Sequence, residues 1–154
     1  MRIVIMGCGR TGSMLALLMS RVGHEVTVIE KSQDALLRLG KRHACNLIVG
    51  DGLDEDTLRR AAVDKADAFI ACTNGDNTNL MVVQMVRELF GVQRIAAKVN
   101  DPVRAEAYRE YGIFTVTSGS ILAGYLRDWL LGNPPRNIEE YNQFYPELRQ
   151  LLED

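Results

Sequence analysis

The chain has 154 residues, a length typical of a single folded domain of ~100–200 residues. Hydrophobic residues make up 47% of it and charged residues 25%, values that exclude the disordered class. A formal net charge of −2 excludes a strongly basic surface, so we expect no nucleic-acid partner.

Membrane and export signals are missing from the pattern of apolar residues. The longest apolar runs are the size of a strand, well short of the ~20 residues that a membrane span needs. The first apolar segment leads directly into a glycine loop, which is unlike a secretory signal. The three cysteines lack metal-type spacing, and their odd number argues against a closed disulfide set. We therefore expect a cytoplasmic protein with no direct membrane insertion.

The first thirty residues predict the opening unit of a dinucleotide-binding fold. An apolar strand at 2–6 leads into the stretch Gly7-Cys8-Gly9-Arg10-Thr11-Gly12. A helix at 11–21 follows, and a strand at 25–29 ends against Glu30. A glycine motif in this strand-loop-helix context, with an acidic residue after the next strand, is typical of nucleotide binding.

Each residue type in this motif has a physical role. Gly7 permits the tight turn, Gly9 lets backbone approach a pyrophosphate, and Gly12 lets the helix pack closely. The helix then directs its free N–H groups and positive dipole end toward that phosphate. The Glu30 carboxylate accepts hydrogen bonds from ribose hydroxyls and repels a 2′-phosphate, so NADP is disfavoured, although Lys31 weakens this exclusion.

The remaining elements alternate between strand and helix. The apolar residues Leu15, Leu18, Met19 and Val22 are expected to face the sheet from the first helix. Further strands are predicted at 46–49, 68–72, 94–99 and 114–116, and further helices at 32–41, 55–62, 77–90, from Pro102 onward and at 118–131.

This alternation predicts an α/β fold of the Rossmann-like, doubly wound type, with a six-stranded parallel sheet in the order 3-2-1-4-5-6. Ligands of such sheets bind at the carboxyl ends of the strands, near the point where the strand order reverses. The residues expected around that crevice are Gly7 to Thr11, Glu30, Asp51, Thr73, Asn74 and Lys98.

The composition changes after Gly132. We expect a nucleotide-binding domain at 1–131 and a short helical tail at 132–154, separated by Pro134 and Pro135. The tail either packs on its own domain or covers a partner subunit. Its apolar residues at helical spacing are Ile138, Tyr141, Phe144, Leu148, Leu151 and Leu152.

The helix before the tail carries an unusually broad apolar face. Trp129 near its end is either an anchor of a subunit interface or a cover for the sheet edge, because large aromatic side chains suit both roles. The residues of this face are Ile121, Leu122, Tyr125, Leu126, Trp129 and Leu130.

The motifs together resemble those of the regulator of potassium conductance family, also called RCK, KTN or TrkA-N, over residues 1–131. The matching stretches are GCGRTG with Glu30, the block GDGLDEDTLRRAAVDKADAFIACTNGDNTNL at 50–80, and AKVNDP at 97–102. The resemblance implies a cytoplasmic regulatory subunit at the inner face of the cell membrane. It would dimerise or form a ring beneath a potassium channel or transporter and bind NAD(H), ATP, ADP or AMP.

The resemblance also implies roles for individual residues. The loop from Gly7 to Gly12 would hold phosphates, Glu30 the ribose, and Asp51 would approach the adenine. Arg10 offers a guanidinium to further phosphate groups, so ADP or ATP rivals NAD(H). The full set of expected nucleotide-binding residues is Gly7, Cys8, Gly9, Arg10, Thr11, Gly12, Glu30, Lys31, Asp51, Gly52, Thr73, Asn74 and Lys98. Members of the family usually continue into a second regulatory lobe, whereas in this sequence only the short tail follows residue 131.

Two other functions remain open at this point. One is an NAD-dependent oxidoreductase or its cofactor-binding domain, and the other is a dimerisation module without a ligand. The only histidines, His24 and His43, lie at the edge of the sheet opposite the expected crevice, and no tyrosine has a lysine four residues further on. We therefore expect no catalytic and no metal-binding residues.

Overall fold

The strands of the computed structural model, which describes residues 1–148, form one six-stranded sheet in the order β3-β2-β1-β4-β5-β6. Adjacent strands from β3 through β5 pair in parallel. This confirms the predicted Rossmann-like order. The strands are β1 (Arg2–Met6), β2 (Glu25–Glu30), β3 (Asn46–Val49), β4 (Ala68–Ala71), β5 (Ile95–Lys98) and β6 (Phe114–Val116).

Helical segments connect these strands, as right-handed crossovers between parallel strands require. The α-helices are α1 (Arg10–Arg21), α2 (Gln33–Leu36), α3 (Glu55–Arg60), α4 (Asp76–Phe90), α5 (Pro102–Glu110), α6 (Ser118–Leu130) and α7 (Ile138–Tyr141). Short 3₁₀ helices are η1 (Leu37–Leu39), η2 (Val63–Lys65) and η3 (Pro146–Leu148).

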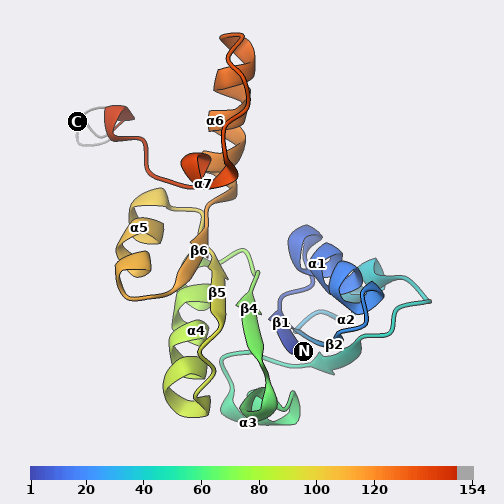
Figure 1. Cartoon of the computed structure of the whole chain (residues 1–154). Coiled ribbons are helices and arrows are strands. Elements are labelled where there is room, and N and C mark those ends of the chain that lie inside the picture. Colours follow the sequence, from blue (N-terminus) through green and yellow to red (C-terminus); the bar gives the residue numbers. More distant parts are fainter. Residues whose placement is uncertain (149–154) are drawn as a thin grey trace. The chain divides into compact units, whose positions relative to one another are not determined.

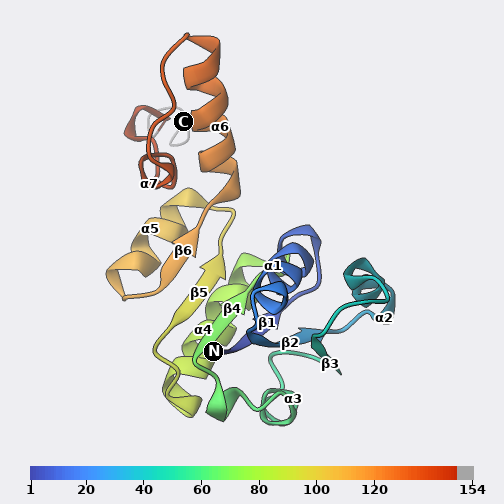
Figure 2. The ribbon, with the colours of Figure 1, turned by 45° about the vertical axis from the view of Figure 1, so that its right-hand side comes forward.

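The chain divides after Lys98 into two compact units, Met1–Lys98 and Val99–Asp154. In the first unit, Ile3 and Ile5 of β1 pack in a core cluster with Ala16 of α1, while Val4 and Met6 are buried on the opposite face of the strand. Figures 1 and 2 show α1 and α2 on one side of these strands and α4 on the other. Burial on both faces is what a parallel sheet requires. The predicted domain boundary at residue 131 stays a prediction.

The helix predicted at 32–41 is shorter than expected. Ser32 caps it as predicted, since its hydroxyl accepts a hydrogen bond from the Ala35 N–H at 3.3 Å. The α-helix ends after one turn at Leu36, and η1 carries the chain to Gly40, whose φ is +72°. Glycine favours this left-handed conformation, which ends the helical turn before Lys41.

The face by which α1 packs on the sheet also differs from the prediction. Leu15 and Met19 pack against the core, but Leu18 and Val22 are 58% and 68% exposed. The buried positions of α1 are instead the small residues Gly12, Ser13 and Ala16. Small side chains let the helix backbone approach the sheet closely, so a search for large apolar residues misses this face.

The described part of the tail packs on the second unit. Tyr141 and Phe144 are only 3% and 6% exposed. The Asn142 amide accepts a hydrogen bond from the Thr117 N–H at 2.8 Å and donates one to the Thr115 carbonyl at 2.9 Å. This favours packing on the tail's own chain. Ile138 and Leu148 are exposed, and the predicted apolar residues Leu151 and Leu152 lie outside the described residues.

A buried carboxylate joins α6 to this tail. Asp128 is 1% exposed and forms ion pairs with Arg127 at 3.3 Å and Arg136 at 3.0 Å. The Tyr141 hydroxyl donates to the same carboxylate at 3.1 Å and accepts a hydrogen bond from the Arg136 N–H at 2.8 Å. Residues from three segments of the second unit thus satisfy one acid.

Candidate functional site

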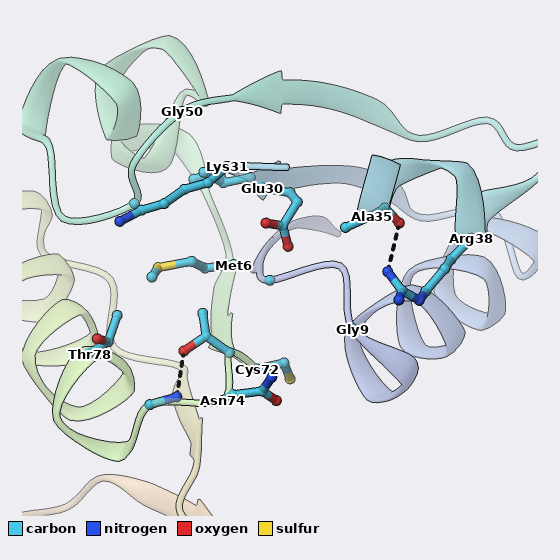
Figure 3. Close-up of a pocket in the computed structure, with 15 residues that line it drawn as sticks. Met6, Gly9, Glu30, Lys31, Ala35, Arg38, Gly50, Cys72, Asn74 and Thr78 are labelled. Atoms are coloured by element: carbon cyan, nitrogen blue, oxygen red, sulfur yellow. Dashed lines mark hydrogen bonds between the residues drawn. The ribbon is translucent and has the colours of Figure 1, made fainter. Parts of the chain in front are cut away.

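A pocket of about 410 Å³ lies at the carboxyl ends of β1, β2 and β4, within the first unit (Figure 3). This is the edge of the sheet at which the sequence predicts the ligand. Its lining residues are Met6, Gly7, Gly9, Ile29, Glu30, Lys31, Ala35, Arg38, Gly50, Gly52, Cys72, Thr73, Asn74, Gly75 and Thr78.

The three glycines of the loop have different local roles. Gly7 has φ +98°, and a Cβ there would lie 3.0 Å from backbone atoms of Cys72 and Thr73. A Cβ on Gly12 would lie 2.0 Å from the Gly7 carbonyl oxygen, whereas one on Gly9 would meet no atom within 4 Å. Gly7 and Gly12 are therefore needed by the protein itself. Gly9 leaves open space at the pocket wall, directly before the N-terminus of α1.

Glu30 is held with its carboxylate toward the pocket (Figure 3). The Cys8 N–H donates to its Oε2 at 2.7 Å, and the Ser32 N–H donates to its Oε1 at 3.0 Å. Among the described residues, no cation forms an ion pair with Glu30. Each carboxylate oxygen can accept a further hydrogen bond. The glycine loop thus orients Glu30 and leaves acceptor capacity for a ligand.

Lys31 and Asp51 form an ion pair at 2.9 Å beside Glu30. The pKa of Asp51 is lowered, first by the hydrogen bond from the Leu53 N–H and then by Lys31. Lys31 lines the pocket and Asp51 does not. In this structure the charge of Lys31 is therefore compensated at the pocket rim.

The polar turn after β4 is fixed by Asn79, a residue that the sequence analysis did not single out. Asn79 is fully buried in α4, and its Oδ1 accepts hydrogen bonds from the Thr73 N–H at 3.0 Å and the Thr73 hydroxyl at 2.7 Å. Its Nδ2 donates to the Lys98 carbonyl at 2.8 Å. A buried amide with these partners rigidifies the loop that carries Thr73 and Asn74. The sequence feature that could have indicated Asn79 is its place as an asparagine in the first turns of a helix that follows a strand and a polar turn.

Seven of the thirteen predicted nucleotide-binding residues line the pocket, and the remaining six do not. Cys8 is fully buried and contributes its backbone N–H to Glu30. Arg10 and Thr11 are exposed in the first turn of α1, and Gly12 packs against Gly7. The Lys98 carbonyl anchors Asn79. The sixth is Asp51, the partner of Lys31.

Lys98 also acts on a residue of the pocket wall. Burial raises the pKa of the Cys72 thiol, and the nearby positive charge of Lys98 lowers it in part.

The wall of the pocket contains further residues that the sequence did not indicate, among them Met6, Ala35, Arg38 and Thr78. Arg38 stands eight residues beyond Glu30 in η1, a position that the motif does not mark.

No histidine lines the pocket in the described chain. The His24 ring lies 3.3 Å from the N-terminal amine, and the His43 Nδ1 accepts a hydrogen bond from the Cys45 N–H at 3.2 Å. Among the described side chains, no three His, Cys, Asp or Glu residues group as metal ligands would. None of the helices described here has both the length and the apolar character of a membrane span.

The chain is similar to curated potassium uptake proteins over most of its length. It is 46% identical over 118 residues to the Trk system potassium uptake protein TrkA of Streptomyces coelicolor, covering 77% of this chain and 53% of that protein. It is 39% identical over 127 residues to a TrkA homologue of Methanothermobacter thermautotrophicus, covering 82% and 58%. The chain therefore spans about half the length of these relatives.

Two solved structures of GsuK share this fold, and each contains a bound nucleotide. GsuK solved with ADP matches with a TM-score of 0.72 and 28% identity, over 84% of this chain and 33% of that one. GsuK solved with NAD matches with a TM-score of 0.66 and 25% identity, over 81% and 22%. The model of the TrkA-N domain family matches residues 3–119, and the chain accordingly belongs to the TrkA-N domain family.

Proposed function

We propose that the pocket binds an adenine nucleotide, either NAD(H) or ADP/ATP. The observation that carries this proposal is the Glu30 carboxylate, which two backbone N–H groups fix beside Gly9 and the N-terminus of α1. A ribose would donate its hydroxyls to Glu30, and its phosphates would lie against Gly9 and the free N–H groups of the helix. The ligands of GsuK support this choice.

Two features bear on which nucleotide is bound. Glu30 repels a 2′-phosphate, so it disfavours NADP. The exposed Arg10 in the first turn of α1 can move its guanidinium toward a second or third phosphate, which suits ADP or ATP as well as NAD(H). The proposed site therefore favours an adenosine whose ribose carries no 2′-phosphate, and it suits NAD(H), ADP and ATP alike.

The pocket serves regulation in this proposal and carries out no chemical reaction. Its described wall contains no histidine or tyrosine, and its one lysine, Lys31, is paired with Asp51. The curated relatives are potassium uptake proteins. We infer that the chain is the nucleotide-sensing part of a regulatory subunit that works on a membrane potassium channel or transporter, at the inner face of the cell membrane.

Dimerisation would link the pocket to that partner. The outer face of α6 leaves large apolar side chains in solvent, and Trp129 is 71% exposed. A contiguous face of this kind suits a subunit contact with a second copy, or with further copies in a ring. Others on this face are Leu122, Tyr125, Leu126 and Leu130. Nucleotide binding shifts dimer geometry only if the ligand binds two geometries with different affinity.

Calorimetric titration with NADH, NAD, ATP, ADP and AMP tests nucleotide binding. We expect at least one of them to bind, and Gly9→Glu to abolish that binding while leaving the melting temperature unchanged, because a side chain at Gly9 meets open space. Absence of binding by all five nucleotides would overturn the proposal.

Light scattering tests the dimer, and we expect a dimer that Trp129→Arg converts to monomer. A wild-type monomer at micromolar concentration would rule the dimer out.

A further inference from the structure

A second cation, Arg38, lines the nucleotide pocket on the side opposite the turn after β4. It lies in η1 and shares this wall with Ala35, whose carbonyl accepts a hydrogen bond from the guanidinium at 3.5 Å. Figure 3 shows the side chain extending from its backbone toward the space that Glu30 also faces. A single contact of this length leaves most of the five N–H donors of arginine available.

The other charges of the pocket are already compensated or oriented. Lys31 is paired with Asp51 at 2.9 Å, and Glu30 accepts two backbone N–H groups. Among the side chains that the structure describes, no carboxylate forms an ion pair with Arg38. Of the two cationic side chains in the pocket wall, only Arg38 therefore has its charge available for a ligand.

The charge of Arg38 acts on the glycine loop. Burial is the main reason why the pKa of the Cys8 thiol is raised, and Glu30 raises it further, whereas Arg38 lowers it. Cys8 is the residue whose N–H holds Glu30. The guanidinium is therefore close enough to influence the place where the ribose and the first phosphate would lie.

A surface arginine could occupy this position for solubility alone. Arginine at the end of a helical turn also interacts favourably with the nearby carbonyls, as the Ala35 contact illustrates. Neither role requires the side chain to line a pocket next to an acid that selects ribose. A planar guanidinium there matches the geometry of a phosphate, with which it can form two parallel hydrogen bonds.

We propose that Arg38 is a specificity-determining residue of this pocket that binds a second phosphate of the nucleotide, in addition to the 5′-phosphate at the glycine loop. This inference rests on the proposed nucleotide binding. The second phosphate is either the β-phosphate of the 5′ chain or a 2′-phosphate on the ribose. In the second case Arg38 offsets the repulsion by Glu30, and the pocket accepts NADP(H) despite its acidic residue.

The test compares three ligands that differ by one phosphate: 5′-AMP, 5′-ADP and adenosine 2′,5′-bisphosphate. Arg38→Gln removes the charge and keeps much of the side chain, and Arg42→Gln is the matched control, because Arg42 is exposed and does not line the pocket. A charge-assisted hydrogen bond of ~1.5–3 kcal/mol corresponds to a loss of affinity of about tenfold or more.

We expect Arg38→Gln to weaken 5′-ADP, adenosine 2′,5′-bisphosphate or both by about tenfold, and 5′-AMP by less than about twofold. The ligand that loses affinity identifies the phosphate. Arg42→Gln should change none of the three. An equal loss for all three ligands, or no loss for any, overturns the role of Arg38 while nucleotide binding stands. Failure of the wild-type protein to bind any of the three overturns the role of Arg38, whereas the proposed nucleotide binding is overturned only if NADH, NAD and ATP fail to bind as well.

Discussion

Two carboxylates, Glu30 in the first unit and Asp128 in the second, show how similar side chains acquire different roles. Glu30 is partly buried, accepts hydrogen bonds from two backbone N–H groups in the described part of the chain, and faces a pocket. Asp128 is 1% exposed and is satisfied by Arg127, Arg136 and Tyr141. A carboxylate that retains acceptor capacity can take part in ligand binding. One whose capacity is used within the chain holds structural segments together.

The largest effect is expected from Gly12→Ala, which tests whether the pocket around Glu30 depends on the loop packing. A Cβ 2.0 Å from the Gly7 carbonyl forces backbone to move, which should cost about 1–3 kcal/mol of unfolding free energy and abolish detectable nucleotide binding. Chemical denaturation and calorimetric titration measure the two effects. Gly9→Ala is the matched control, because it meets no neighbour and should leave stability unchanged. Normal binding by Gly12→Ala would contradict this account of the loop.

Glu30→Gln tests the open carboxylate directly. If Glu30 binds the ribose as proposed, we expect nucleotide affinity to fall about tenfold or more, because its charge-assisted hydrogen bonds to the ribose would be lost. The amide also has only one acceptor oxygen for the Cys8 and Ser32 N–H groups, so stability should fall by about 1 kcal/mol. Titration and denaturation measure both. Unchanged affinity would show that Glu30, like Asp128, has only a structural role.

Asp128→Asn tests the saturated carboxylate. The amide cannot pair with both arginines, so we expect the melting temperature to fall by about 5 °C while nucleotide affinity stays unchanged. Asp64→Asn, which changes an exposed acid, serves as the control and should not alter the melting temperature. A loss of nucleotide affinity in Asp128→Asn would show that the two carboxylates do not act independently.

The same variant should show that the contribution of Asp128 to stability depends on pH. Burial raises the pKa of Asp128, but the Tyr141 hydrogen bond and the two arginines lower it by more, so the net shift is downward. Asp128 then contributes stability above its unfolded pKa of about 3.9, and this is lost as the pH falls through its lower folded pKa. The melting-temperature difference between wild type and Asp128→Asn should therefore be largest at neutral pH and decrease below about pH 4. A difference that is constant down to pH 2 would contradict the ion pairs.

The smallest effect is expected from Lys31→Ala, which removes the ion pair with Asp51 beside Glu30. Both side chains are substantially exposed, at 63% and 44%, so solvent screens the pair. We expect less than about 0.5 kcal/mol of destabilisation and less than about a twofold change in nucleotide affinity. Thermal melts at low and high salt measure the former. A tenfold loss of affinity would mean that Lys31 leaves Asp51 to bind the ligand.

The sequence by itself determined the order of the strands, the glycine loop and Glu30, because these depend on local signals. Strand-helix alternation restricts the topology, and the spacing from Gly7 to Gly12 defines a strand-to-helix turn. Only the tertiary structure decided which polar side chains are engaged in hydrogen bonds and ion pairs within the protein. Asn79, Arg38 and Asp128 resemble ordinary helix residues in the sequence.

The tail shows why such residues were beyond sequence analysis. Its apolar spacing was compatible with packing on its own chain or on a partner, and in the structure Tyr141 and Asn142 form hydrogen bonds to Asp128, Thr115 and Thr117 of the same chain. Such partners lie far apart in the sequence, so no local pattern specifies them. Local chemistry determines the elements and the motif, whereas burial and hydrogen-bond partners, which exist only after folding, decide which side chains remain available for a ligand.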